Sequence, residues 1–146
     1  MITVRVCDSG FDVGVETDGL MRAGVGGIAS FIGIVRGDGG LVSLTLDHYP
    51  AMTERALQAL SDAAFARWPL SAVTIIHRVG TMAPGDRIVF VGTASAHRAA
   101  ALDATAFLID RLKTDAPFWK RETFDDGRAN WVEAREIDAE SAARWS

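Results

Sequence analysis

The chain has 146 residues, of which 49% are hydrophobic and 23% charged, which suits a single domain covering residues 1–146 and excludes a disordered or fibrous protein. No apolar run approaches the roughly 20 residues that span a bilayer, and "MITVRVCDSG" lacks the features of a secretory signal, so we expect a cytoplasmic protein without membrane contact. The net charge of −4 argues against a general nucleic-acid coat. The single cysteine, Cys7, cannot form an internal disulfide and is expected to be a small buried residue rather than a nucleophile.

The first half of the chain predicts two strands and a helix. Residues 26–37 and 41–49 are β-rich, and because the turn-forming "GDGG" separates them we expect a hairpin. Residues 53–68 have helical spacing, with Thr53 as the expected N-cap and a proline just beyond the end. The apolar stripe of this helix comprises Leu57, Leu60, Ala64 and Trp68.

The second half repeats this order. Residues 72–80 and 87–95 read as strands joined into a second hairpin by "APGD". Residues 96–114 predict a helix whose apolar stripe, Leu102, Ala106 and Ile109, continues into Lys113. An irregular segment after Pro117 and a short closing strand, 130–135, complete the chain. The order β-β-α-β-β-α-β favours a layered α+β fold, with helices on one face of a mainly antiparallel sheet.

Two positions stand out by residue type. Lys113 and Lys120 are the only lysines, whereas the other thirteen basic side chains are arginines. A lysine amine can lose its proton when burial or a neighbouring cation lowers its pKa, whereas guanidinium stays charged. Lys120, between Trp119 and Arg121, is therefore a candidate nucleophile, proton donor or compact charge for an anion. For Lys113 alone, a solvated helix end is the simpler interpretation.

Basic residues cluster around these lysines. Residues 97–121 contain five Lys or Arg against three Asp, a net +2 within a chain of net −4. Such a local excess favours a small anionic ligand or an acidic tail over a long polymer. At "SAHRAA" a strand meets a helix, so Ser95, His97 and Arg98 could form an anion site at free backbone N–H groups. A capped helix with two exposed polar side chains explains the same residues.

Other candidates are weaker. Arg36 ends the strand "FIGIVR" beside a glycine-rich turn, and it fits either a binding role or a plain surface position. His48 and His77 lack carboxylate or cysteine partners at ligand spacing, so neither is expected to bind a metal. No P-loop or dinucleotide-binding pattern occurs, and we expect no resident cofactor or metal.

Five blocks in order carry a family resemblance: "FIGIVRG", "LDHYPAMTE", "RWPLSAVTIIHRVGTMAPGD", "VFVGTASAHRAAALDATAFLIDRLKTDAPFWKRE" and "WVEAR". Together they resemble the large, catalytic subunit of molybdopterin synthase, from residue 26 to Trp145. The resemblance implies an α+β fold with an α/β hammerhead core and an additional antiparallel β subdomain, which is more elaborate than one layered sheet. It also implies a sulfurtransferase of molybdenum cofactor biosynthesis.

In that family a homodimer of large subunits binds two small ubiquitin-like sulfur-carrier subunits, giving a heterotetramer. Each small subunit carries a thiocarboxylate on a C-terminal Gly-Gly tail, and its sulfur passes to cyclic pyranopterin monophosphate to build a dithiolene. The resemblance implies that Lys120 is the central catalytic group, supported by Lys113. It further implies a substrate-binding set in which two residues come from the neighbouring subunit: Arg36 and Arg135, with His97 and Arg98 across the dimer.

Two readings from other functional classes remain open on the sequence. One is a non-catalytic dimeric module that binds an acidic peptide tail or a phosphate-bearing ligand. The other is a single-stranded nucleic-acid module, with Phe118, Trp119 and Phe124 as stacking platforms beside basic residues. Aromatic residues in such a segment are more often part of a core.

Overall fold

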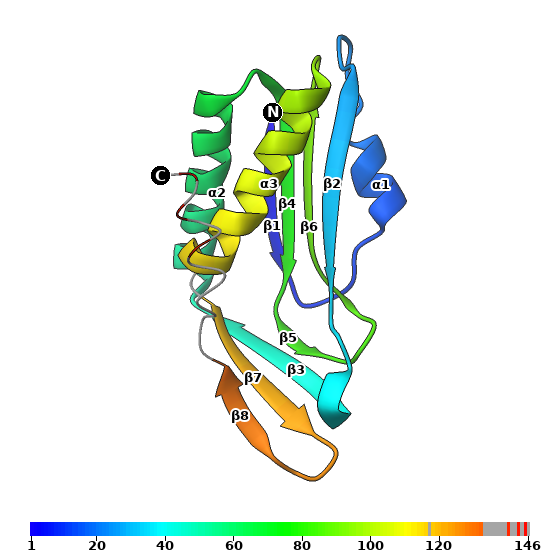
Figure 1. Cartoon of the computed structure of the whole chain (residues 1–146), viewed down its shortest axis with the longest axis vertical. Helices are drawn as coiled ribbons and strands as arrows, with labels where there is room; N and C mark the ends of the chain where they lie inside the picture. Colours follow the sequence, from blue (N-terminus) through cyan, green and yellow to red (C-terminus); the bar gives the residue numbers. More distant parts are fainter. Residues whose placement is uncertain (117, 133–139, 141–142, 144, 146) are drawn as a thin grey trace.

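Two four-stranded sheets form the framework of the computed structural model, which describes residues 1–116, 118–132, 140, 143 and 145. The first sheet has the order β1 (Ile2–Cys7), β4 (Leu70–Arg78), β6 (Arg87–Ser95) and β2 (Gly27–Ile34). Its β1–β4 pair is parallel and its other pairs are antiparallel. The second sheet, wholly antiparallel, has the order β5 (Gly80–Met82), β3 (Leu41–His48), β7 (Phe118–Phe124) and β8 (Ala129–Val132). Figure 1 shows the second sheet below the first.

Both faces of the first sheet are covered. The helices α2 (Pro50–Arg67) and α3 (Arg98–Asp115) lie on one face, and the short α1 (Val13–Asp18) lies on the other side (Figure 1). Because successive strand residues point to opposite faces, β4 and β6 contribute to two separate cores. The core under the long helices comprises Val73, Ile75, Val89 and Val91 with Leu57, Leu60, Phe107 and Leu108. The opposite core comprises Ala72, Ile76, Phe90 and Ala94 with Leu20.

The expected helices are present, with different caps. The first begins at Pro50 and not at Thr53, because proline at the first helical position needs no N–H partner. Thr53 is therefore not the N-cap: it is buried in the first turn, and its hydroxyl donates to the Tyr49 carbonyl at 3.0 Å. The second helix begins at Arg98, with His97 as its N-cap residue. Ser95 lies two residues earlier, where its Oγ accepts from the His97 backbone N–H at 3.1 Å.

The predicted apolar stripe of α3 is wrong. Leu102 is 58% exposed, and the buried residues of this helix are Ala100, Ala101, Ala104, Thr105, Phe107, Leu108 and Leu112. In an alanine-rich helix the small residues approach the sheet closely, so their spacing marks the buried face better than the larger Leu102 does. Lys113 follows Leu112 directly and thus lies at the edge of the buried face.

The first predicted hairpin is also wrong. β2 pairs with β6, and β3 pairs with β5 and β7, so the two strands belong to different sheets. The intervening "GDGG" forms a 3-10 turn, Asp38–Gly40, in which Gly39 and Gly40 have φ of 65° and 82°. These left-handed conformations, readily available to glycine, turn the chain from one sheet into the other.

The second predicted hairpin is confirmed as the β4–β6 pair, but β5 lies between its strands. Gly80, with φ of 86°, redirects the chain out of β4 so that β5 can pair with β3. The two sheets meet around a small third core of Val35, Leu46 and Met82, all buried. This junction replaces the single layered sheet expected from element order.

The segment after Pro117 is a strand, not an irregular stretch. β7 runs antiparallel to β3 and to β8. The predicted closing strand 130–135 corresponds to β8, which ends at Val132, and positions 133–135 lie outside the described residues. A mixed core sheet with an added antiparallel subdomain confirms the α+β fold with a hammerhead core and a β subdomain. Among the described helices, none is long and apolar enough to cross a membrane.

Candidate functional site

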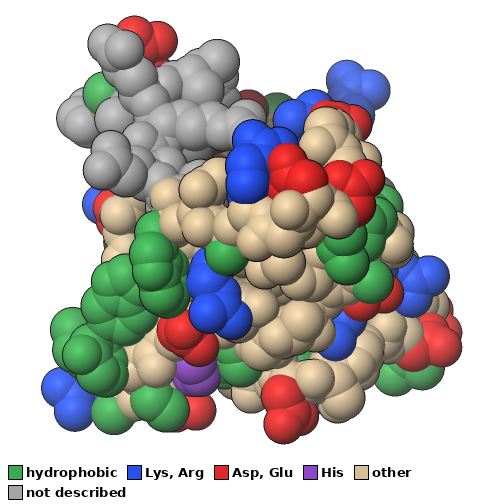
Figure 2. Space-filling view, turned by 90° about the horizontal axis from the view of Figure 1, so that it is seen from below, with side chains coloured by type: hydrophobic (Ala, Val, Ile, Leu, Met, Phe, Trp, Pro, Cys, Tyr) green, Lys and Arg blue, Asp and Glu red, His purple; other side chains and the backbone are tan. Residues whose placement is uncertain are grey.

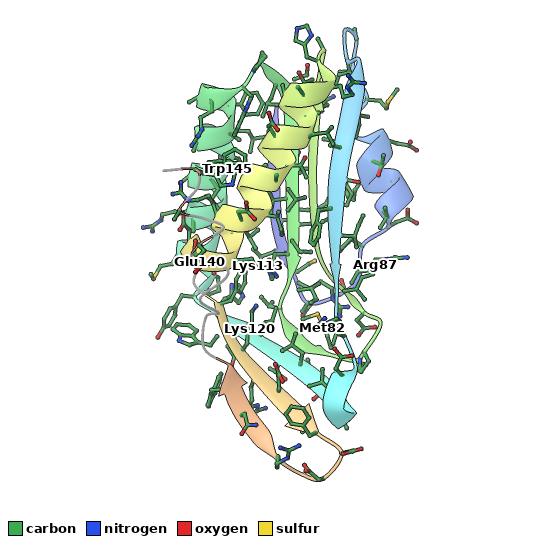
Figure 3. All side chains as sticks on the ribbon, viewed as in Figure 1. Met82, Arg87, Lys113, Lys120, Glu140 and Trp145 are labelled. Carbon is green, nitrogen blue, oxygen red and sulfur yellow. The ribbon has the colours of Figure 1, made fainter. Side chains whose placement is uncertain are left out.

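The two lysines lie where the two sheets meet. Lys113 is in the last turn of α3, and Lys120, seven positions later, is the third residue of β7. Figure 3 shows both side chains in the region where the end of α3 lies above the start of β7. Both residues are half-buried. The end of α3 and the start of β7 thus carry the only two lysine side chains in one part of the fold.

Strand pairing sets the direction of Lys120. It lies opposite Leu46 of β3, which is fully buried in the junction core. Phe118, two residues earlier, shares this inner face because strand side chains alternate. Trp119 points the other way, where it is exposed and contacts Tyr49 edge-to-face at 4.8 Å. Lys120 therefore faces the interior of the junction rather than the outer surface.

His77 lies at the inner side of this junction. It ends the buried row Val73, Ile75 and His77 on the helix-facing side of β4, and only 4% of its surface is exposed. Its Nδ1 lies 2.8 Å from the carbonyl oxygen of Arg78. Its ring stacks on Phe118, with centroids 4.0 Å apart and an interplanar angle of 20°. Phe118 is therefore a packed residue at the sheet junction and not an open stacking platform.

His48 approaches the same aromatic ring from β3. Its ring centroid lies 6.2 Å from that of Phe118, at an angle of 30°. Its Nδ1 lies 3.2 Å from the Thr53 hydroxyl, which itself donates to a backbone carbonyl. Because that hydroxyl proton is already used, the Nδ1–H of His48 is the donor. Both imidazoles are thus held by ordinary hydrogen bonds.

The electrostatics of the site appear in the titration of His77. The pKa of His77 is lowered from 6.5 to about 3, mainly by burial. The positive charges of Lys113 and Lys120, and then of His48, contribute to this lowering, and the hydrogen bond to Arg78 opposes it. His77 is consequently neutral near pH 7. The charges of both lysines act on the same imidazole, so the two side chains lie in the same part of the fold (Figure 3).

The sequence predicts no metal-binding role for His48 and His77, because neither has carboxylate or cysteine partners at metal-ligand spacing. The described residues hold no group of three or more His, Cys, Asp or Glu that could bind a metal. The histidines contribute packing and polarity instead. The sequence does contain a sign that His77 is unusual. In the strand "AVTIIHR" its titratable side chain lies at one of the alternate positions that point into the core, where the other residues are apolar.

Arg36 follows β2 and is the neighbour of Val35, which packs in the junction core with Leu46, the strand partner of Lys120. It precedes the turn that leads into β3, its side chain is 72% exposed, and its Nε is 3.4 Å from Asp38. Within one chain no described contact joins Arg36 to the lysine pair, and its substrate-binding role stays a prediction.

His97 and Arg98 lie at the other end of α3 from Lys113. Both are exposed. Fifteen residues separate Arg98 from Lys113, a helix rise of about 22 Å. One chain therefore cannot bring these residues to the lysine pair, and a role for them there requires a second copy of the chain. Arg135, the remaining predicted site residue, lies outside the described residues.

The outer surface of the second sheet has a different character. Seen from that end of the molecule, apolar side chains gather on one side, and cationic and anionic side chains are interspersed (Figure 2). The exposed large apolar residues there include Val42, Tyr49, Trp119 and Trp131. The lysine pair is thus distinct from a continuous basic surface.

These features describe an α+β protein in which two half-buried lysines lie near the junction of its two sheets. The chain belongs to the MoaE protein family, whose model matches residues 6–115. It is 52% identical, over 140 residues and 92% of each chain, to the molybdopterin synthase catalytic subunit of Escherichia coli (strain K12). The family resemblance expected from the sequence is confirmed.

Solved structures agree with this assignment. The MoaE protein from Burkholderia ambifaria MC40-6 superimposes with a TM-score of 0.87 and 43% identity, covering 99% of this chain and 98% of that one. Molybdopterin synthase from Staphylococcus aureus gives a TM-score of 0.82 at 27% identity, covering 88% and 95%. The likeness extends beyond the residues matched by the family model.

Proposed function

We propose that this chain is the catalytic subunit of a molybdopterin synthase. It transfers sulfur from the C-terminal thiocarboxylate of a small ubiquitin-like subunit to cyclic pyranopterin monophosphate, forming the dithiolene. The observation that carries the proposal is that Lys113 and Lys120 both lie at the sheet junction, in a chain that has no other lysine. The relationship to molybdopterin synthase catalytic subunits supports the choice of reaction.

The charges of the two reactants explain why a cationic site is needed. A substrate phosphate and a thiocarboxylate are both anions, so bringing them together costs Coulomb energy that fixed positive charges offset. The lysine pair supplies two such charges in a partly buried setting, where charge interactions are stronger than in water. The neutral state of His77 leaves the site without a third buried cation.

The division of labour follows from the chemistry of the sulfur donor. A thiocarboxylate is already ionised at neutral pH, so no side chain need deprotonate it. The enzyme orients the sulfur, polarises the attacked carbon and helps oxygen leave. We assign Lys120 the central catalytic role, because it faces inward from a paired strand, and we assign Lys113 a supporting role.

The remaining binding residues come from more than one part of the assembly. In our proposal Arg36 and Arg135 hold phosphate and carboxylate groups, and His97 and Arg98 are presented by the second subunit of a homodimer. The length of α3 supports this last assignment, since it separates these two residues from their own lysine pair. Two small subunits then complete a heterotetramer. We further propose that residues 1–146 form one domain that acts in the cytoplasm.

The proposal is tested by single-turnover sulfur transfer with purified thiocarboxylated small subunit and the pyranopterin precursor. Lys120→Ala is expected to lower conversion by 100-fold or more, on the order expected when a charge-stabilising group is lost. Lys120→Arg preserves the charge but not the titratable amine, so a comparable loss points to proton transfer or covalency. Near-normal conversion by correctly folded Lys120→Ala would show the assignment to be wrong.

A matched control removes a positive charge elsewhere. Arg55 is exposed on α2, and Arg55→Ala is expected to retain full activity. If the wild-type chain binds the small subunit but forms no dithiolene under these conditions, the non-catalytic binding module becomes the better description.

A further inference from the structure

β2 is an edge strand without the usual protection. Among the described strands, β1 and β2 border the first sheet, and β5 and β8 border the second (Figure 1). An edge strand presents unpaired backbone N–H and C=O groups, and proteins commonly shield such edges by short strands, charged side chains, proline or bulges. β1 carries Arg5, and β5 and β8 have only three and four residues. β2 has eight residues, "GIASFIGI", with neither a charge nor a proline.

Exposed apolar side chains accompany this open edge. Phe31 and Ile34 of β2 are 40% and 53% exposed. On α3, Leu102 and Thr105 are three positions apart and therefore share one side of the helix. That side lies over β2, because the Thr105 hydroxyl donates to the Ala29 carbonyl at 3.4 Å. Leu102, which is also exposed, therefore lies at the same border of the molecule.

The two ends of β2 lie beside basic residues of the proposed substrate-binding set. At its start, a Cβ added to Gly27 would lie 3.7 Å from the Cα of Arg98, so the first turn of α3 borders this end. At its other end, Arg36 follows Ile34 by two positions. The strand from Gly27 to Ile34 is about 23 Å long. One chain therefore holds Arg98 and Arg36 at opposite ends of the same edge strand.

We propose that β2 pairs with β2 of a second copy of this chain, antiparallel and about a two-fold axis, so that the two first sheets become one continuous sheet. A two-fold interface must be self-complementary, and an uncharged strand pairs with itself without placing like charges opposite each other. Antiparallel pairing reverses the ends, so the start of β2 in one protomer lies about 5 Å across from the end of β2 in its partner. Arg98 then lies beside the partner's Arg36.

A second copy explains more than an unrelated strand would. Any extended peptide could complete the backbone hydrogen bonds of β2, but it would leave Arg98 and Arg36 at opposite ends of the strand. Two guanidinium groups from different protomers repel unless an anion lies between them, which matches the anionic substrates of the proposed reaction. The inference deepens the proposed function, on which the catalytic meaning of the two arginines rests: it names the surface through which one subunit presents Arg98 to the other.

The first test measures the oligomeric state of the full-length chain by sedimentation velocity at micromolar concentration, where we expect a dimer. Phe31 lies at the middle of β2 and therefore near its own symmetry mate. Phe31→Glu places two like charges together and should raise the dissociation constant of the dimer about tenfold or more. An equimolar mixture of Phe31→Glu and Phe31→Lys should recover dimers, because opposite charges then face each other. A monomeric unaltered chain, or a dimer that Phe31→Glu does not weaken, would overturn the proposal.

Val42→Glu is the matched control for the added charge. Val42 is likewise a half-exposed apolar residue of a strand, but it belongs to β3 in the second sheet. Its replacement should leave the dissociation constant of the dimer unchanged, and circular dichroism checks that each variant is folded. An effect at Val42 as large as that at Phe31 would place the interface elsewhere and contradict the proposal.

The second test locates the pairing by cross-linking. Cys7→Ser removes the only cysteine, and Ser30→Cys or Phe31→Cys then introduces one thiol at the middle of β2. In antiparallel pairing about a two-fold axis one residue lies directly opposite itself, with Cβ atoms about 4.5–5.5 Å apart. Mild oxidation should give a disulfide-linked dimer from at least one of these variants, and none from Arg55→Cys on α2. If neither middle position cross-links, the proposal is wrong, even where Phe31→Glu does not fold.

The third test joins the interface to the reaction. Lys120→Ala and Arg98→Ala chains should each transfer sulfur poorly alone, but a mixed dimer of the two has one site with both residues intact. Co-expressed chains should therefore recover about one quarter of the unaltered single-turnover activity, since about half of the dimers are mixed. Transfer that stays at the level of the separate variants would overturn the exchange of Arg98 between protomers. The first two tests need no substrate or small subunit, so they decide on the interface even if the proposed reaction fails.

Discussion

Trp145 anchors the C-terminal end of the chain to the two long helices, and its replacement should measurably destabilise the protein. Its indole N–H donates to the Asp110 carboxylate at 2.7 Å (Figure 3 marks Trp145). Its ring meets Trp68 and Phe107 edge-to-face, at 5.7 and 5.8 Å. Arg67 donates to the Trp145 carbonyl at 2.6 Å, a contact that any residue at this position retains.

The expected cost of Trp145→Ala follows from these contacts. Two aromatic pairs contribute about 0.5–1.5 kcal/mol each, and a hydrogen bond to a carboxylate contributes about 1.5–3 kcal/mol. Ordering a residue near the chain end costs about 1–2 kcal/mol, which is recovered when the anchor is lost. The net loss in the free energy of unfolding is therefore about 3 kcal/mol, within a range of about 0.5–5 kcal/mol. Trp145→Phe keeps an aromatic ring but loses the indole N–H, so it should lose the hydrogen-bond part, about 1.5–3 kcal/mol.

Urea unfolding followed by far-UV circular dichroism measures this loss without relying on tryptophan fluorescence. In thermal unfolding, the Tm of Trp145→Ala should be roughly 5–10 °C lower than that of the unaltered chain, given its size. Trp131→Ala is the matched control: Trp131 is 61% exposed on β8, and its loss should change stability by less than about 0.5 kcal/mol. If Trp145→Ala costs no more than Trp131→Ala, the helices do not hold Trp145 as described.

Two further predictions concern the site and its surroundings. Because the folded-state pKa of His77 is lowered to about 3 from 6.5, the unfolded chain binds the extra proton first as pH falls, and stability is lost between about pH 6.5 and pH 3. The loss should be roughly 2 kcal/mol from pH 7 to pH 5, and a urea series across pH should show it much reduced in His77→Phe. Gly26→Ala would place a Cβ 2.3 Å from the Ala96 carbonyl oxygen, beside the start of α3, whereas the Cβ of Gly10→Ala meets nothing within 4 Å. Thermal unfolding should show a loss of about 1–3 kcal/mol for the first and near neutrality for the second, and equal losses would contradict the packing described.

Local patterns were good guides to the elements. The helix expected over 53–68 is Pro50–Arg67, and the one expected over 96–114 is Arg98–Asp115. Helical and strand periodicity depend on residues a few positions apart, so a linear reading captures them. The boundaries moved by a few residues because capping depends on details such as Pro50.

Pairing between strands could not be read in the same way. The sequence does not predict β7, because its centre, "WKRET", is polar and its partner residues on β3 lie 70 or more positions earlier. The "GDGG" turn was read as a hairpin because it has the right composition. Which strand accepts the hydrogen bonds is a non-local choice, decided by the cores that form on each side of the first sheet.

The site residues, like the strands, could be predicted from the sequence only in part. Scarcity of lysine and the family resemblance were enough to single out Lys113 and Lys120, seven positions apart. Nothing in the linear order joins His77 to Phe118, which stack across two different sheets. The separation of Arg98 from Lys113 is likewise a property of an unbroken helix. Because of it, the basic residues near one lysine pair have to be assigned to one subunit or to the other.

By itself, then, the amino-acid sequence determined the two long helices, most of the strands, the family and the two amines, because each depends on residue type or short-range spacing. Only the tertiary structure decided that the chain divides into two sheets, and that their junction places a neutral imidazole beside both lysines. The physical reason is that burial and strand pairing act between distant segments, and they alone set the desolvation and the neighbouring charges that define the site.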